Sequence, residues 1–300
     1  MHARTIFVAA TVALALGVSS SLIGQQAPAA PAPTPAPAVP QPAAETRTPP
    51  TFFPPNYIGW EIPSPPVTVP EGFTPIFNGR NLAGWHISRT NHHGRTPDFF
   101  VQHGIIHATQ NPLGGGGILL TDKAYKNFEL YMEVKPDFGN DSGIFLRSTE
   151  SGAAYQVTMD FLPNGGMGNV IAEGGMQLAA NAGRARGAGA RAGGAARQGG
   201  APATPAPPPP GFGEGNQATA AWVKAWKRDS WNVVRVRMVG EVPQVTVWFN
   251  DVQLTDFKDT ANSAVGGMTE GPIAIQVHGG GRWVPGGFWR WRNIGIKELP

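Results

Sequence analysis

Residues 127–160 read NFELYMEVKPDFGNDSGIFLRSTESGAAYQVTMD and decide the fold class. Three short segments in this stretch alternate apolar and polar residues, and turn-forming Gly, Asn, Asp, Ser and Pro separate them. Side chains on a β-strand point alternately to opposite faces, so each segment has one apolar face. The opposite faces carry Glu129, Tyr131 and Glu133; Gly143, Phe145 and Arg147; and Gln156, Thr158 and Asp160. This mixture of carboxylates, an arginine, an amide and aromatics indicates a small-molecule site on a sheet.

The same alternation returns later in the chain. It is present in WNVVRVRM (231–238), PQVTVWFN (243–250) and PIAIQVHGG (272–280), and WRWRNIGIKEL (289–299) adds a last strand. Helical periodicity is limited to AWVKAWKRD (221–229), which is long enough for one or two turns. Many short strands joined by Gly- and Pro-rich turns predict an all-β sandwich or barrel.

The amino-terminal residues 1–24 resemble an export signal. An apolar run from Ile6 to Val18 follows His2 and Arg4 and precedes small residues. It is shorter than the about 20 apolar residues that a membrane span needs. We therefore expect export to the periplasm or the outside, without stable membrane insertion once the signal is removed. A retained anchor is the alternative.

Two low-complexity segments divide the rest of the chain. Residues 25–50 are rich in Pro and Ala and predict an extended, semi-rigid linker. Residues 51–71 hold aromatic side chains among prolines and are expected to form an irregular strap. The folded domain is placed at 72–300, interrupted at about 179–220 by a Gly/Ala/Pro-rich insertion that is expected to be disordered. Such an insertion is tolerated because loop-closure entropy grows only with the logarithm of length.

Composition excludes several functions. The chain has no cysteine, so disulfides, thiol catalysis and thiolate metal sites are excluded. The net charge of +3 is small and scattered, and the arginines near residue 190 lie in a Gly/Ala tract without aromatic neighbours, which argues against nucleic acid as a partner. The sequence leaves the oligomeric state open.

Several motifs in order carry a resemblance to a known family. They include GFTPIFNGRNLAGW (72–85), FFVQHGIIHAT (99–109), GNDSGIFLR (139–147), AYQVTMD (154–160) and FWRWRNIGIKEL (288–299). Together they resemble the 3-keto-disaccharide hydrolase domain family over about 72–178 and 221–299. The resemblance implies a concanavalin A-like jelly roll of two curved antiparallel sheets with a saccharide-binding concave face. The family usually carries Glu where this chain has Gln156, and the long insertion is a second departure.

The resemblance also implies a reaction, cleavage of glycosides whose sugar is oxidised to a ketone at C3. The ketone acidifies the C2 proton, so that a modest base can remove it and the C1 substituent can leave. Water then adds to the unsaturated sugar, and the net result is hydrolysis. This chemistry needs one base, one acid and donors for an enolate, with no cofactor. It does not need the fixed carboxylate pair of ordinary glycosidases.

The polar strand faces supply the candidate residues, provided that they share one surface. Asp160 and Glu133 are the candidates for proton abstraction, and His278 completes the acid–base set. Arg147 is the candidate electrophilic donor. The residues expected to bind substrate are Gln156, Trp248, Asn250 and Gln276. Structural salt bridges, solvated strand faces and core aromatics are the alternatives for these side chains.

Metal binding is the weaker alternative for the histidines. His103 and His107 are four residues apart, as in a helical site, and His92 and His93 are adjacent. This region is predicted to be strand and loop, so the spacing does not fit a helical metal motif. The residues Asn140, Asp141 and Ser142 could offer oxygen ligands to calcium, but GNDSG is typical of a tight turn. No metal is assigned.

A non-catalytic carbohydrate-binding module on the same face is the rival hypothesis, because one fold can serve both functions. Burial of two titratable groups beside an arginine favours the enzyme, whereas a flat aromatic platform lined with amides favours the binding module. A third possibility is a surface-assembly protein displayed on its Pro/Ala stalk, which predicts an exposed apolar patch.

Overall fold

The computed structural model describes residues 64–95, 97–181 and 220–300. The predicted export signal, the linker, the first part of the strap and nearly all of the insertion lie outside the described residues. Within the described part, residues 64–70 have no regular structure, and the Thr68 amide donates to Asn293. None of the helices in this part is both long and apolar enough to cross a membrane.

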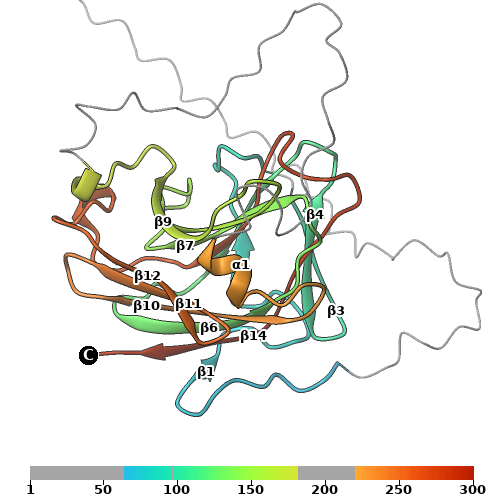
Figure 1. Ribbon diagram of the computed structural model, residues 1–300, viewed down its shortest axis with the longest axis horizontal. Coiled ribbons are helices and arrows are strands. Elements are labelled where there is room, and N and C mark those ends of the chain that lie inside the picture. The colour runs from blue at the N-terminus through green and yellow to red at the C-terminus, as the bar shows by residue number, and fades with distance from the viewer. Residues whose placement is uncertain (1–63, 96, 182–219) are drawn as a thin grey trace, which may run out of the picture. The chain divides into compact units, whose positions relative to one another are not determined.

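Two antiparallel sheets form the fold, as Figure 1 shows. The eight-stranded sheet has the order β12-β11-β10-β6-β14-β4-β3, with β1 also paired to β14. Its strands are β1 (Thr74–Pro75), β3 (Pro97–Gln102), β4 (Ile105–Gln110), β6 (Phe128–Val134), β10 (Asn232–Val239), β11 (Gln244–Phe249), β12 (Val252–Lys258) and β14 (Trp289–Glu298).

The six-stranded sheet has the order β2-β5-β13-β7-β8-β9. Its strands are β2 (Trp85–Ile87), β5 (Gly117–Thr121), β7 (Asn140–Leu146), β8 (Ala154–Phe161), β9 (Met167–Glu173) and β13 (Ala274–Val277). The chain passes back and forth between the sheets, which is the jelly-roll arrangement. The predicted all-β, concanavalin A-like sandwich is confirmed.

Helical structure in the described residues is short. The elements are α1 (Ala221–Ala225) and two 3₁₀ turns, η2 (Ala179–Asn181) and η4 (Val265–Gly267). Helix α1 confirms the turn predicted at residues 221–229. It buries Trp222, and the nearby Trp226 packs on Phe249, with 5.3 Å between the ring centroids.

The main core lies between the two sheets and follows the predicted alternation. In β6 the side chains of Phe128, Leu130, Met132 and Val134 are all fully buried, and the intervening residues are half-buried. Strand β10 alternates in the same way and pairs with β6. Burial of one face per strand is the main stabilising contribution of a sandwich.

Strands β7 and β8 are buried on both faces over most of their length. On the outer face of the six-stranded sheet, five residues form a second apolar cluster: Ile118, Leu120, Phe145, Ala154 and Ala274. Residues from two loops cover it. A side chain at Gly152 would meet Asn91, Phe145 and Ile118, so these loops pack closely on the sheet at this end of β7 and β8.

Candidate functional site

Asp141 and Asp160 lie directly opposite each other on β7 and β8, on the outer face of the six-stranded sheet. Their side chains are 3% and 23% exposed. Burial disfavours the charged form of a carboxyl group, and a neighbouring carboxylate adds to this effect. Burial, followed by the interaction with Asp141, raises the pKa of Asp160 to about 8. Burial also raises the pKa of Asp141.

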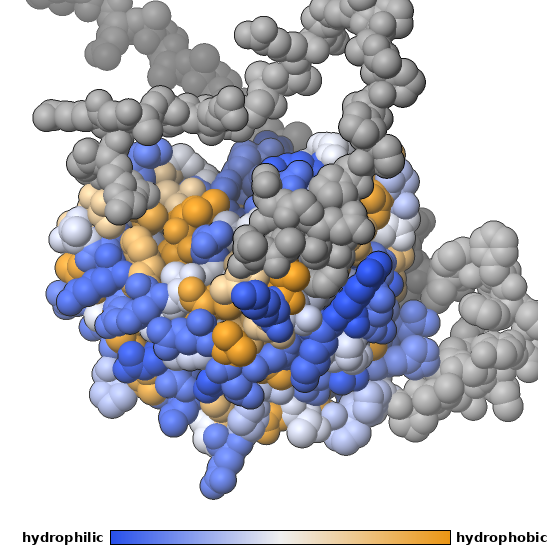
Figure 2. All heavy atoms as spheres, viewed as in Figure 1, coloured by the Kyte–Doolittle hydropathy of each residue, from blue (hydrophilic) through white to orange (hydrophobic). Residues whose placement is uncertain are grey.

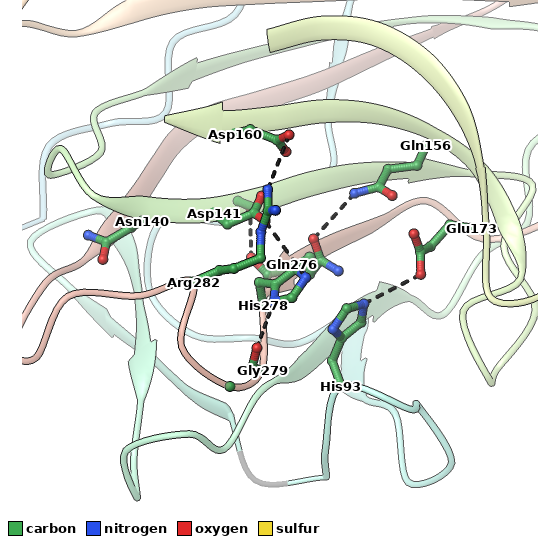
Figure 3. A network of polar contacts seen from close by, with 12 residues as sticks. His93, Asn140, Asp141, Gln156, Asp160, Glu173, Gln276, His278, Gly279 and Arg282 are labelled. Carbon is green, nitrogen blue, oxygen red and sulfur yellow. Dashed lines mark hydrogen bonds and ion pairs between the residues drawn. The ribbon is translucent and has the colours of Figure 1, made fainter. Parts of the chain in front are cut away.

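Arg282 contacts both carboxyl groups (Figure 3). Its Nε donates to Asp141 Oδ2, and its Nη2 lies 3.3 Å from Asp160 Oδ2. The arginine belongs to the loop between β13 and β14, which also pairs with the start of β7 through the Asp141 amide and the Arg282 carbonyl. The guanidinium lowers both carboxyl pKa values, but burial has the larger effect.

His278 follows β13 and lies beside the carboxyl pair. Its Nδ1 is 2.6 Å from the Gly279 carbonyl oxygen, so Nδ1 carries the proton and donates it. Its Nε2 lies 3.7 Å from Asp141 Oδ2. Burial lowers the pKa of His278 to about 4, which makes the imidazole neutral at neutral pH. Nε2 therefore presents a lone pair to the site.

Gln156 and Gln276 lie next to these groups on the same face and are hydrogen-bonded to each other. The Gln156 Nε2 donates to Gln276 Oε1 over 3.3 Å. The remaining amide atoms, Gln156 Oε1 and Gln276 Nε2, are buried without a hydrogen-bond partner. Buried polar groups are normally hydrogen-bonded, so unpartnered ones indicate where a polar ligand or water binds.

Unpartnered atoms are concentrated here. Of the seven such buried side-chain atoms in the described part of the chain, three belong to this outer face, namely Asp141 Oδ1, Gln156 Oε1 and Gln276 Nε2, and a fourth, His93 Nε2, belongs to a bordering loop. They include both donors and acceptors, as recognition of a polyhydroxylated ligand requires.

Three further ligand-type side chains border the site. His92 and His93 lie in the loop after β2, and Glu173 ends β9. The Nε2 atoms of the two histidines lie 3.0 and 3.5 Å from the same oxygen, Glu173 Oε1. The His93 ring lies against His278, with 4.4 Å between the centroids. These are the residues that could hold a metal ion.

The sequence-based expectation that Glu133 shares a surface with Asp160 is wrong. The chain crosses from one sheet to the other between Val134 and Asn140, so Glu133 lies on the eight-stranded sheet. It accepts from Arg292 Nε at 2.8 Å and from Asn293 Nδ2 at 3.0 Å. Burial raises its pKa, but these hydrogen bonds together bring it below the ordinary value. Glu133 is a largely buried carboxylate that pairs with Arg292 on that sheet.

Arg147 is also not in the site. It is fully buried at the end of β7, with a backbone φ of 49°. Its guanidinium donates to three backbone carbonyls, those of Gly240 at 2.6 Å, Glu241 at 3.2 Å and Lys126 at 3.3 Å. It joins two loops to β7, and Arg282 occupies the place expected for Arg147.

Trp248 and Asn250 lie on β11 and in the turn after it, in the eight-stranded sheet. Trp248 packs against Arg235, with 5.0 Å between the guanidinium carbon and the ring centroid. Asn250 has a φ of 46° and donates to the Ala225 carbonyl and to Asn232 Oδ1, both at 2.7 Å. Neither joins the other predicted binding residues, because only Gln156 and Gln276 lie on the six-stranded sheet.

Sequence reasoning assigned no role in this site to Asp141, Arg282, His92, His93 or Glu173. It named Asp141 and the two histidines only as weaker alternatives for metal binding, and it did not single out Arg282 or Glu173. Side chains two residues apart on a strand point to the same face. Alternation could therefore have placed Asp141 on the outer face with Gly143 and Phe145. Arg282 and the two histidines lie in loops, where no periodicity indicates direction. Glu173 could be grouped with the histidines only through the tertiary structure.

The fold and site define a jelly-roll sandwich with titratable groups gathered on the outer face of one sheet. Residues 72–297 match the 3-keto-α-glucoside-1,2-lyase-like domain, and the chain belongs to this family. It is thus a glycosyl hydrolase-like or carbohydrate-binding jelly-roll protein. No curated protein sequence matches the chain.

The solved structures that match the chain have low sequence identity to it. A candidate glycosyl hydrolase from Parabacteroides distasonis ATCC 8503 is 20% identical, with 78% of this chain and 99% of that chain covered and a TM-score of 0.43. A carbohydrate-binding module, CBM66 from Bacillus subtilis, is 9% identical, with 72% and 96% covered and a TM-score of 0.38.

Proposed function

We propose that this protein cleaves 3-keto glycosides by elimination followed by hydration. The observation that carries the proposal is the Asp141–Asp160 pair, which is bridged by Arg282 beside a neutral His278. Paired carboxyls with raised pKa values are typical of sites that transfer protons near neutral pH. Family membership supports the choice of substrate.

The reaction begins with loss of the C2 proton to a base. The C–H electron pair forms the enolate of the C3 ketone, and the C1–oxygen bond then breaks while the leaving oxygen takes a proton. In the second half, water adds its hydroxyl to C1 and a proton returns to C2. The sum is one water consumed and one glycosidic bond cleaved, with no change of oxidation state.

His278 is assigned as the base. The hydrogen bond to Gly279 fixes the proton on Nδ1 and leaves the Nε2 lone pair as the acceptor. The ketone acidifies the C2 proton, so a modest base is enough. Once Nε2 is protonated, the imidazolium is stabilised by the Asp141 carboxylate, whose Oδ2 is 3.7 Å away.

Asp160 is assigned as the acid for the leaving oxygen. With a pKa of about 8, it is protonated at neutral pH, and it is accessible to a ligand. A general acid with a raised pKa is what departure of an alkoxide requires. This assignment revises the expectation that Asp160 abstracts the proton.

Arg282 supplies the positive charge for the enolate oxygen, because its side chain is half exposed while it contacts both carboxyl groups. Gln156 and Gln276 provide the unpartnered donor and acceptor for sugar hydroxyls.

The test uses a chromogenic 3-keto glucoside and the matching unoxidised glucoside. Release of aglycone from the keto form alone, with deuterium entering C2 when the reaction runs in D₂O, is the expected result. Equal cleavage of both glucosides would overturn the proposal in favour of ordinary hydrolysis. Cleavage of neither, with measurable sugar binding, would overturn it in favour of a binding module.

A further inference from the structure

We propose that His92, His93 and Glu173 bind one divalent transition-metal ion, with Zn²⁺ as the best match. Two imidazoles and one carboxylate are a common protein ligand set for a zinc ion that keeps an open coordination position. The proton-transfer scheme above makes no use of these three side chains.

The spacing of the ligand atoms fits such an ion. The three atoms lie within 4.8 Å of one another, and Glu173 Oε1 is 3.0 Å from His92 Nε2 and 3.5 Å from His93 Nε2. For metal–ligand distances of about 2.0–2.1 Å, tetrahedral geometry places neighbouring ligand atoms about 3.3 Å apart. The observed distances lie on both sides of this value.

An independent observation concerns His93. Its side chain is only 9% exposed, and its Nε2 makes no hydrogen bond of acceptable geometry, because its contact with Glu173 Oε1 is 3.5 Å long. Burying a nitrogen without a hydrogen bond of good geometry costs free energy, which a bound ion would recover. Figure 3 marks this contact between His93 and Glu173 with a dashed line.

The loop that carries the histidines is fixed before any ion binds. Asn91 Oδ1 accepts from the His93 amide at 2.9 Å, and Asn91 Nδ2 donates to the Ser151 carbonyl at 2.9 Å. The Gly116 amide donates to the His93 carbonyl at 3.0 Å. Ligands held by such supporting contacts bind a metal with less loss of entropy.

A metal ion bound at these three residues would lie close to the proposed base, His278. Three protein ligands leave a position for water or for a substrate oxygen, and the His93 ring lies 4.4 Å from the ring of the base His278. An ion here would bind an oxygen of the sugar and polarise it as a Lewis acid. This role rests on the proposed function, whereas the binding of the ion does not.

The binding is tested on untagged full-length protein, first treated with a chelator and then titrated with Zn²⁺ by calorimetry. We expect one ion per chain, and Co²⁺ at the same site should give the strong visible absorption of tetrahedral coordination. The isosteric change Glu173→Gln should weaken Zn²⁺ binding at least tenfold.

Glu150→Gln is the matched control, because Glu150 Oε2 also lies 3.0 Å from a histidine nitrogen, that of His86, outside the site. It should leave Zn²⁺ affinity unchanged. If Glu173→Gln fails to fold, His92→Gln replaces it, because this side chain is half exposed. Absence of saturable binding, or equal affinity in wild type and the site variant, would overturn the proposal.

The two proposals fail separately. Zn²⁺ binding without cleavage of any 3-keto glucoside would refute the proposed function and leave the metal site standing. Cleavage by a chain that binds no Zn²⁺ or Co²⁺ would refute the metal site and leave the elimination chemistry standing.

Discussion

Asp141 and Asp160 face each other across β7 and β8, and Arg282 contacts both. The more exposed member of the pair has a pKa of about 8, so the pair holds a proton at neutral pH. Two carboxyl groups in different environments can thus take different roles. Asp141 is almost fully buried and is suited to stabilise a cation, whereas Asp160 can reach a substrate.

Asp160→Asn should slow cleavage in a way that depends on the leaving group. An alkyl alkoxide needs a proton from the acid, so kcat/KM for an alkyl 3-keto glucoside should fall by about 10²-fold or more. A nitrophenolate leaves without protonation, and its loss should be much smaller. Glu133→Gln is the control and should leave both rates unchanged, because Glu133 lies on the other sheet. Equal losses for the two aglycones would contradict the acid role.

The pH profile should have a descending limb set by Asp160. Its carboxyl faces Asp141, Arg282 and His278, and its pKa is about 8. As pH rises through this value the acid is lost, so kcat/KM for the alkyl substrate should fall about tenfold per pH unit. The limb should disappear in Asp160→Asn. A profile that keeps rising above pH 8 would instead identify Asp160 as a base.

Thermal stability gives a readout of the same carboxyl group that does not depend on activity. A carboxyl with a raised folded-state pKa stabilises the protein fully below its unfolded pKa of 3.8 and loses this contribution as pH rises towards about 8. Asp160→Asn removes the cost of ionisation. The quantity to compare is the Tm of Asp160→Asn minus the Tm of wild type. This difference should therefore be a few degrees more positive at about pH 9 than at about pH 5. An equal difference at both pH values would mean that burial does not perturb Asp160.

Arg147→Met should destabilise the fold without belonging to the site. The change leaves three backbone carbonyls without their charged donor, and we expect a loss of about 2–4 kcal/mol in the free energy of unfolding, measured in urea. Arg237→Met is the control, since that guanidinium is 40% exposed and 3.7 Å from Glu129, and should cost less than about 1 kcal/mol. Similar losses in both variants would contradict a structural role specific to Arg147.

The sequence predicted the strands well because period-2 alternation is a local property. Segments 128–134, 140–146 and 154–161 are strands, and β6 buries the face that alternation assigned to the core. Alternation cannot say which sheet a strand joins. Glu133 and Asp160 were placed together for this reason, although their strands lie in different sheets.

Local backbone conformation is the second reason why alternation did not predict all the residues of the site. Alternation gives Arg147 the same face as Phe145, but a φ of 49° at Arg147 ends the alternation and turns the side chain to the carbonyls of neighbouring loops. Arg282 and the adjacent histidines come from loops, whose side-chain directions depend on tertiary contacts. Asp160, His278, Gln156 and Gln276 were the predicted residues that the structure brings together.

The surface of the molecule also bears on the assembly hypothesis. On the face shown in Figure 2, apolar side chains occur in small groups among polar and charged ones. The exposed large apolar residues of the described chain come from separate segments, among them Leu113, Val252 and Val284. Single exposed apolar side chains of this kind are ordinary on protein surfaces.

The covered apolar cluster on the six-stranded sheet limits the length of any ligand. Phe145, Ile118 and their neighbours close one end of the outer face, while the carboxyl pair lies at the other end. A long polysaccharide lying along the strands would have to displace packed loops. For the proposed function we therefore expect the terminal unit of a short saccharide, and not the interior of a polymer, as the substrate.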